Sequence, residues 1–242
     1  MFWFDILRFV GYWDFVVRIF ARRFVILIFK SKSMELVSTA FLIIALVFSV
    51  VIHEVAHGSA AAAQGDFTAK YAGRLTLNPL KHLDWVGSVL VPGFLIVANA
   101  PILLGWAKPV PVNPLNFRDK RWGNAKVSIA GAAANLGLAL VFGLALRFWP
   151  EVSGAAAANF YALAQSVVII NLVLAVFNMV PVPPLDGSHV LFALLPASQN
   201  EFKLFLQKYG FVFLLVFLLF FVPVIWPIVA FLYQLITGIP LM

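Results

Sequence analysis

The sequence contains no cysteine, few charged residues and no polar linker. Of its 242 residues, 11% are charged and 63% are hydrophobic, whereas a soluble domain averages roughly 25% charged and 45–50% apolar residues. Without cysteine there is no disulfide, thiolate metal ligand or cysteine nucleophile. Any metal must therefore be bound by His, Asp or Glu. The composition excludes a soluble globular enzyme and favours a single membrane-embedded unit.

The charge balance is basic, with 17 Lys and Arg against 10 Asp and Glu, which gives a net charge of +7. In so apolar a chain, we assign this excess to cytoplasmic loops and to contact with the lipid bilayer. No basic patch is interleaved with aromatic residues, so we expect no nucleic-acid partner.

Long uncharged tracts define the expected fold. A bilayer span takes about 20 mostly apolar residues, and the candidate tracts are 36–52, 86–107, 127–146, 152–185 and 209–242. The first continues to Ala63, and the last contains Pro223 and Pro227, which predict two helices joined at a turn. We therefore predict an all-α polytopic membrane protein, a bundle of about five to six membrane segments.

Residues 1–30 have a different pattern. At about 100° per residue, one helical face gathers Arg8, Gly11, Asp14, Arg18 and Arg22. This predicts an amphipathic helix that lies at the membrane interface. A signal peptide is excluded, because only six apolar residues separate Arg23 from Lys30 and no small-residue cleavage site follows.

The first chemical motif is His53-Glu54-Val55-Ala56-His57, an H-E-x-x-H sequence. On a helix, positions i and i+4 share a face, so both imidazoles can bind one zinc ion while Glu54 accepts a proton from water. Ionisable residues inside an apolar helix are costly and mark function by default. The alternative is a hydrogen-bonded cluster near a helix end that contacts headgroups.

A catalytic zinc site usually has three protein ligands and one open position. The remaining candidates are His82, Glu151, Glu201, His189 and Asp186. Asp186 follows three prolines that must stop a helix, and Gly187 permits a tight turn beside it. Irregular backbone at membrane depth is tolerated where it lines a wet cavity, which makes Asp186 a natural ligand. Otherwise it caps residues 187–195.

These residues together resemble the site-2 protease family of intramembrane zinc metalloproteases, specifically its small members without PDZ or CBS domains. The first motif is H-E-x-x-H, and Asn178 through Gly187 reads N-M-V-P-V-P-P-L-D-G, the family's N-x-x-P-x-P-P-L-D-G. Gly131-Ala-Ala-Ala-Asn135 resembles its G-x-x-x-N element, with Ala132 where many members have proline. The loops 73–84 and 105–114 are also similar, so the resemblance covers about residues 36–200.

The resemblance implies hydrolysis of a peptide bond in or near the transmembrane helix of a membrane-protein substrate. It implies one zinc ion per chain on His53, His57 and Asp186, with Glu54 as the catalytic residue. The amides of Asn135 and Asn178 would bind the unwound substrate backbone or the oxyanion. Their other interpretation is hydrogen bonding between helices.

Three segments follow from this assignment. Residues 1–35 form the interfacial segment, 36–200 the metalloprotease core, and 201–242 a C-terminal helical hairpin that could gate substrate entry. The alternative functions are a catalytically silent relative that binds membrane helices and, with less support, a metal transporter. The sequence leaves the substrate and the oligomeric state open.

The last expectation concerns topology. His53–His57 and Asp186 must reach one zinc ion, so the two helix ends that carry them must face the same side of the membrane. Three apolar tracts lie between these two helix ends, and if all three crossed the membrane the ends would face opposite sides. The tract 86–107 is interrupted by Pro92 and Pro101, so we expect it to enter the membrane and return. The side in question then carries eight basic residues, namely Lys70, Arg74, Lys81, Lys108, Arg118, Lys120, Arg121 and Lys126. By the positive-inside rule, the zinc site lies nearer the cytoplasm, in a prokaryotic cell membrane.

Overall fold

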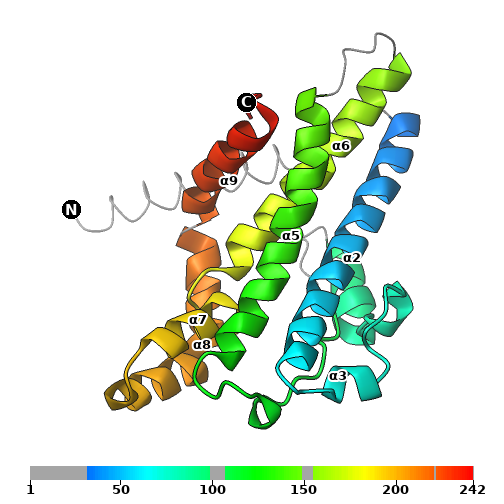
Figure 1. Cartoon of the computed structure of the whole chain (residues 1–242). Coiled ribbons are helices and arrows are strands. Elements are labelled where there is room, and N and C mark those ends of the chain that lie inside the picture. The colour runs from blue at the N-terminus through cyan, green and yellow to red at the C-terminus, as the bar shows by residue number, and fades with distance from the viewer. Residues whose placement is uncertain (1–31, 99–106, 149–154, 221, 242) are drawn as a thin grey trace, which may run out of the picture. The chain divides into compact units, whose positions relative to one another are not determined.

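The computed structural model describes residues 32–98, 107–148, 155–220 and 222–241. Within these ranges every regular element is a helix and none is a strand (Figure 1). The α-helices are α2 (Lys32–Ala63), α3 (Thr68–Tyr71), α4 (Val91–Val97), α5 (Gly123–Phe148), α6 (Ala155–Asn178), α7 (Gly187–Leu194), α8 (Asn200–Phe220) and α9 (Val222–Thr237). The all-α class is therefore confirmed for the described residues.

Three of these helices are long and apolar enough to cross a membrane. The candidate spans are Thr39–Ala63 in α2, Gly123–Phe148 in α5 and Ala157–Asn178 in α6. They correspond to the predicted tracts that begin at residues 36, 127 and 152. None contains a proline, and α6 ends at Asn178, three residues before the first of the prolines that cannot continue a helix.

The tract 86–107 begins with a π-helical turn, Val86–Leu90, followed by α4. These two elements contain five and seven residues, so at 1.5 Å per residue they rise about 18 Å. The hydrocarbon core is about 30 Å thick, which means that this part alone does not cross it. Residues 99–106 lie outside the described residues, as does the predicted amphipathic helix of residues 1–30.

The chain divides into two compact units. The first contains residues up to Ile43 and Leu83–Lys108, and the second contains Ile44–His82 and Pro109–Met242. The first unit holds α4 and the π-helical turn; the second holds the H-E-x-x-H motif, α5 and everything that follows.

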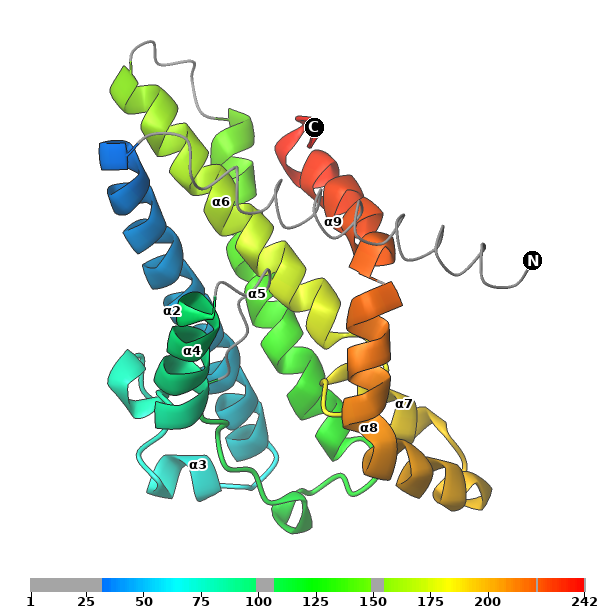
Figure 2. The same ribbon diagram turned by 180° about the vertical axis from the view of Figure 1, so that it is seen from behind.

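In the second unit, α5 packs against α6, α7 and α9, and α6 also packs against α9. Both views show α5 and α6 side by side (Figure 1 and Figure 2). Their contact is lined by small and β-branched residues such as Ala139 and Val168, both fully buried. Tyr233 of α9 is also buried in this core.

The predicted pair of C-terminal helices is present as α8 and α9. Helix α8 begins at Asn200, earlier than the uncharged tract at 209, because its first two turns are amphipathic rather than apolar. Pro223 lies in the first turn of α9, where a missing N–H costs nothing, and Pro227 lies inside the helix.

Candidate metal centre

Helix α2 presents the two histidines of the H-E-x-x-H motif on one face. His53 and His57 are 6% and 8% exposed, and their Nε2 atoms lie 2.9 Å apart. A carboxylate oxygen of Glu54 lies within 4.8 Å of both ligand atoms. The three residues can therefore surround one metal ion.

Asp186 reaches the same place from the segment that follows α6. Its Oδ2 lies 3.1 Å from the Nε2 atom of His53 and 3.1 Å from that of His57. It immediately precedes α7, after the turn that follows α6. Gly187 makes this possible, because a Cβ there would overlap the carbonyl of Met179. Only glycine lets the chain fold back this closely onto the end of α6.

Hydrogen bonds on the far side of each imidazole fix its orientation. The Nδ1–H of His53 donates to Oδ1 of Asn135 over 2.6 Å, and that of His57 donates to the carbonyl of Val127 over 2.7 Å. Both acceptors are on α5. Such bonds fix the tautomer of a metal-binding histidine and leave its Nε2 lone pair free.

This donor set fits zinc. Two unprotonated Nε2 atoms and a carboxylate oxygen form a triangle. The two Nε2 atoms are 2.9 Å apart, and each lies 3.1 Å from the oxygen. In a tetrahedral site with zinc–ligand bonds of about 2.0–2.1 Å, the ligand atoms are about 3.3 Å apart. Three lone pairs at this separation repel one another unless a metal cation or a shared proton lies between them. The site has two imidazoles and one carboxylate, a ligand set found in catalytic zinc sites.

Gly131 allows α5 to approach the histidines. A Cβ on this residue would overlap Cε1 of His57 and would lie 2.7 Å from Cε1 of His53. The hydrogen-bond acceptors on α5 can therefore reach both rings only if residue 131 has no side chain. The glycine of the predicted G-x-x-x-N element thus has a steric role at the cluster.

A buried chain of polar side chains extends behind His53. Nδ2 of Asn135 donates to Oδ1 of Asn171 over 2.8 Å and to the carbonyl of Ser49 over 3.2 Å. Nδ2 of Asn171 donates to Oγ of Ser49 over 2.9 Å. Both asparagines are fully buried, so α2, α5 and α6 are linked at the level of the cluster.

The sequence reasoning missed Asn171 and Ser49. A signal for Asn171 was available, because an amide in the middle of a long apolar span is costly unless it has partners. Ser49 carried no such signal. A serine bonds readily to its own helix, and its contact with α6 depends on how the helices are rotated.

Glu54 has a backbone partner that the sequence did not identify. The N–H of Val110 donates to its Oε2 over 2.7 Å. Val110 lies between Pro109 and Pro111, and proline has no N–H. Of these three residues, Val110 alone can donate, and its donor is directed at the candidate proton acceptor.

The chain around Val110 is tied to the loop that follows α2. Asp66 is fully buried and accepts hydrogen bonds from the N–H of Asn113 over 2.7 Å and from Nδ2 of Asn116 over 2.9 Å. Burial alone would raise the pKa of Asp66, but these bonds and those from Thr68 outweigh it and lower the pKa. Asp66 thereby holds residues 109–116 beside the end of α2.

The other candidate residues lie elsewhere. Nδ2 of Asn178 donates to the carbonyl of Leu174 in its own helix over 3.0 Å. Nε2 of His82 donates to the carbonyl of Thr76 over 2.9 Å, within its own loop. His189 is exposed on α7, Glu201 is exposed in the first turn of α8, and Glu151 lies outside the described residues.

Comparison with known proteins identifies relatives of the chain. Residues 148–220 match peptidase family M50. This stretch contains Asp186 but ends short of the H-E-x-x-H motif, which lies upstream of it.

Two bacterial proteins match over a larger part of the chain. YwhC of Bacillus subtilis (strain 168), named as a zinc metalloprotease, is 40% identical over 195 residues, which cover 77% of this chain and 84% of YwhC. Rip2 of Mycolicibacterium smegmatis, also named as a zinc metalloprotease, is 31% identical over 172 residues, 71% of this chain and 63% of Rip2. No solved structure gives a significant match.

Proposed function

Because this chain belongs to peptidase family M50, the site-2 protease family of zinc metalloproteases, we propose that it cleaves a peptide bond in or near the transmembrane helix of a membrane-protein substrate. The proposed location is a bacterial cell membrane, in line with its bacterial relatives. The observation that carries the proposal is the position of His53 and His57 inside Thr39–Ala63, a helix long and apolar enough to span the membrane. A metal centre there meets peptide bonds that a soluble protease cannot reach.

The residues would divide the work as follows. His53, His57 and Asp186 hold one zinc ion per chain, which supplies Lewis-acid chemistry at the scissile carbonyl. Glu54 takes a proton from the attacking water and passes it to the leaving amine. The N–H of Val110 orients the Glu54 carboxylate through its 2.7 Å hydrogen bond.

The two asparagines take different parts in this proposal. Both amide protons of Asn135 and its oxygen are engaged, and the side chain is fully buried. We therefore assign Asn135 to positioning His53. Among the described residues, Asn178 bonds to its own helix alone and is half-buried, so its amide remains the candidate to bind the unwound substrate backbone.

The test is the substitution Glu54→Gln in the full chain, reconstituted in lipid with a single-span substrate. We expect cleavage to fall at least 100-fold while the zinc content stays unchanged, since general acid–base catalysis contributes about 10²–10⁴-fold. Glu201→Gln is the matched control, because it makes the same change on an exposed site of α8. Undiminished cleavage by the Glu54→Gln protein would refute the proposal.

We also propose that 86–107 enters the membrane and returns, so that the zinc site faces the cytoplasm. The hydrogen bond between Asp66 and Asn116 supports the return of the segment. The two residues flank it, and Nδ2 of Asn116 lies 2.9 Å from Oδ1 of Asp66. The chain has no cysteine, so single cysteines can be introduced at the exposed positions Tyr71 and Leu115. Both should react with an impermeant thiol reagent from the cytoplasmic side only. Labelling from opposite sides would refute the re-entrant arrangement.

The hairpin 201–242 is our proposed substrate gate. Helix α9 is anchored in the core through Tyr233, so we expect the movement to occur in α8. The rings of Phe177 on α6 and Phe217 on α8 are 6.4 Å apart. Cysteines at these two positions, joined by a bifunctional reagent, should block cleavage of a membrane substrate and leave zinc bound. The uncrosslinked double-cysteine protein is the control, and full cleavage after crosslinking would exclude the gate.

A further inference from the structure

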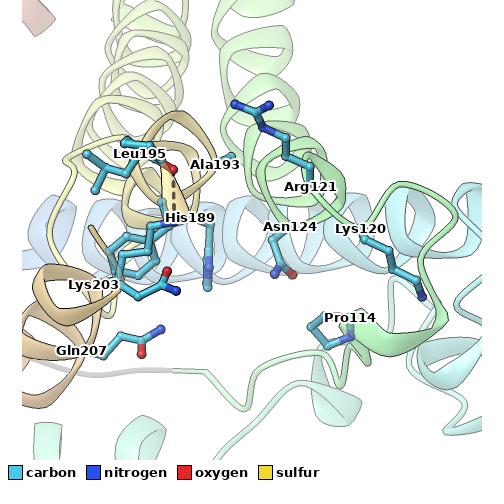
Figure 3. Close-up of a pocket in the computed structure, with 12 residues that line it drawn as sticks. Pro114, Lys120, Arg121, Asn124, His189, Ala193, Leu195, Lys203 and Gln207 are labelled. Carbon is cyan, nitrogen blue, oxygen red and sulfur yellow. Dashed lines mark hydrogen bonds between the residues drawn. The ribbon is translucent and has the colours of Figure 1, made fainter. Parts of the chain in front are cut away.

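A cavity of about 880 Å³ lies in the second unit, between the start of α5 and helices α7 and α8. Lys120 and Arg121 line one side, and Lys203 and Gln207 line the other (Figure 3). Lys120, Arg121 and Lys203 are the cationic side chains among its twelve lining residues, and none of the twelve is Asp or Glu. The cavity is therefore positively charged.

Within the described residues, the partners of the cationic groups are neutral. Lys203 donates to the carbonyl of Leu195 over 3.1 Å, Lys120 donates to the carbonyl of Leu115, and the guanidinium of Arg121 lies 5.5 Å from the ring centre of Trp122. In the part of the chain that the structure describes, none of the three has a carboxylate within 4.0 Å. The nearby Asp119 is paired with Lys126 over 2.6 Å.

The cavity lies next to the metal centre. Its wall includes Asn124, which precedes Gly131 by seven residues on α5, and His189, which follows Asp186 by three residues. Seven residues of helix correspond to about 10 Å, the length of about three residues of extended chain. Lys120 and Arg121 precede Asn124 by four and three residues, so along the chain they lie slightly farther from the cluster.

The lining also suits a polypeptide. Asn124, Asn200 and Gln207 offer both hydrogen-bond donors and acceptors. An unwound peptide carries N–H and C=O groups and can use both, whereas the phosphate of a phospholipid can only accept. Phe192 and Leu195 add apolar surface between the polar groups.

We propose that this cavity binds an acidic stretch of the substrate, about three to six residues from the scissile bond on the aqueous side. The inference rests on the proposed function and adds a specificity determinant to it. An acidic stretch there would be attracted by the cationic groups of Lys120, Arg121 and Lys203, which come from both sides of the cavity (Figure 3). Substrates with glutamate or aspartate there would be preferred over substrates with neutral or basic residues.

The experiment compares two versions of one single-span substrate in lipid vesicles of neutral headgroup. They carry either glutamates or glutamines three to six residues from the mapped cleavage site. We expect the wild-type kcat/KM to be about ten-fold higher for the glutamate version, a difference of about 1.4 kcal/mol, because partly exposed ion pairs are individually weak. The preference should shrink as salt is added.

The triple variant Lys120→Gln, Arg121→Gln, Lys203→Gln should cleave both versions equally. The matched control is Lys70→Gln, Lys81→Gln, Lys208→Gln, which removes the same charge from residues that do not line the cavity. Its preference should remain ten-fold. A preference that survives in the first variant, or is lost equally in both, overturns the proposal.

Two further measurements separate the alternatives. Fluorescence anisotropy with the zinc-loaded Glu54→Gln protein should show tighter binding of a glutamate-rich peptide than of its glutamine counterpart, and the first triple variant should abolish the difference.

If cleavage fails but this binding persists, the proposed function is wrong while the acidic-peptide site stands. If the peptides bind equally and native mass spectrometry shows phosphatidylglycerol retained by wild type but not by the first variant, the site binds lipid and the proposal is overturned.

Discussion

Gly131→Ala is the sharpest test of the metal centre, because it adds one methyl group beside the two imidazoles. That carbon would lie 2.6 Å from Nε2 of His57 and 2.7 Å from Cε1 of His53, whereas carbon contacts are optimal at about 3.5–4.0 Å. Relief requires a displacement of about 1 Å in either the rings or α5. Metal sites tolerate errors of only about 0.2 Å in ligand distance, so the three ligand atoms cannot keep their arrangement.

A shift of α5 would not solve the problem, because the same helix carries the carbonyl of Val127 and the amide of Asn135 that hold the rings. Loss of such partners alone costs about 10–100-fold in metal affinity. We expect the Gly131→Ala protein to lose zinc affinity at least 100-fold and to lose cleavage with it. Overpacking costs about 1–3 kcal/mol, and the better helix propensity of alanine returns about 1 kcal/mol, so the fold should survive.

The measurement is zinc content by mass spectrometry after dialysis against buffered chelator, together with the thermal unfolding midpoint. Gly137→Ala is the matched control, since it lies on the same helix and its added Cβ would meet nothing within 4 Å. It should retain zinc and activity and unfold at the same temperature or slightly higher. Wild-type zinc affinity in the Gly131→Ala protein would show that the cluster is not the metal site.

Four further substitutions test other parts of the structure. Asp186→Ala should remove zinc from the purified protein, and full retention of zinc would exclude Asp186 as a ligand. Val110→Pro deletes the N–H that donates to Glu54 and should lower kcat about 10–100-fold with zinc retained. The reason is that a hydrogen bond to a charged group contributes about 1.5–3 kcal/mol. Val110→Ala, which keeps the N–H, is the control. Asn171→Leu leaves the buried amide of Asn135 without its partner and should lower zinc affinity about ten-fold. Asn178→Leu on the same helix is the control and should keep zinc. Equal zinc affinities in the two variants would show that the buried amide chain does not support the site. Asp66→Asn should lower the unfolding midpoint at pH 7. Because hydrogen bonds hold the folded-state pKa of Asp66 below its ordinary value of 3.8, its contribution is present above about pH 4 and is lost as the pH falls through the lowered pKa. The difference between the two proteins should therefore vanish in acid, and a difference that does not change with pH would contradict this account.

Sequence patterns were sufficient for the parts of the fold and site that depend on local spacing. Uncharged tracts located the three long helices, prolines located the end of α6, and the i, i+4 rule placed His53 and His57 on one face. The position of Asp186 after a proline break indicated a ligand in irregular backbone. Each of these inferences uses residues within one segment.

The parts that escaped prediction depend on how separate helices are rotated. The sequence left Asn135 open between substrate binding and hydrogen bonding between helices, and it could not show that the amide lies between His53 and Asn171. The donor from Val110 to Glu54 is a backbone group, and backbone groups have no identity in a sequence. Periodicity gives the face of a helix but not the residue that it meets on a neighbouring one.

The buried amide chain links the three candidate spans at the level of the candidate metal centre. Hydrophobic burial does not drive helices together in lipid, so their association depends on close packing and on interhelical hydrogen bonds. Here both act at one level: Gly131 permits close packing of α5 on the imidazoles, and Asn135 and Asn171 link α5, α6 and α2 directly behind His53. The groups that orient the ligands are therefore also the groups that set the spacing of the three candidate spans. A substitution that weakens zinc binding through these residues should also loosen the bundle, whereas one that acts through Asp186 alone should not.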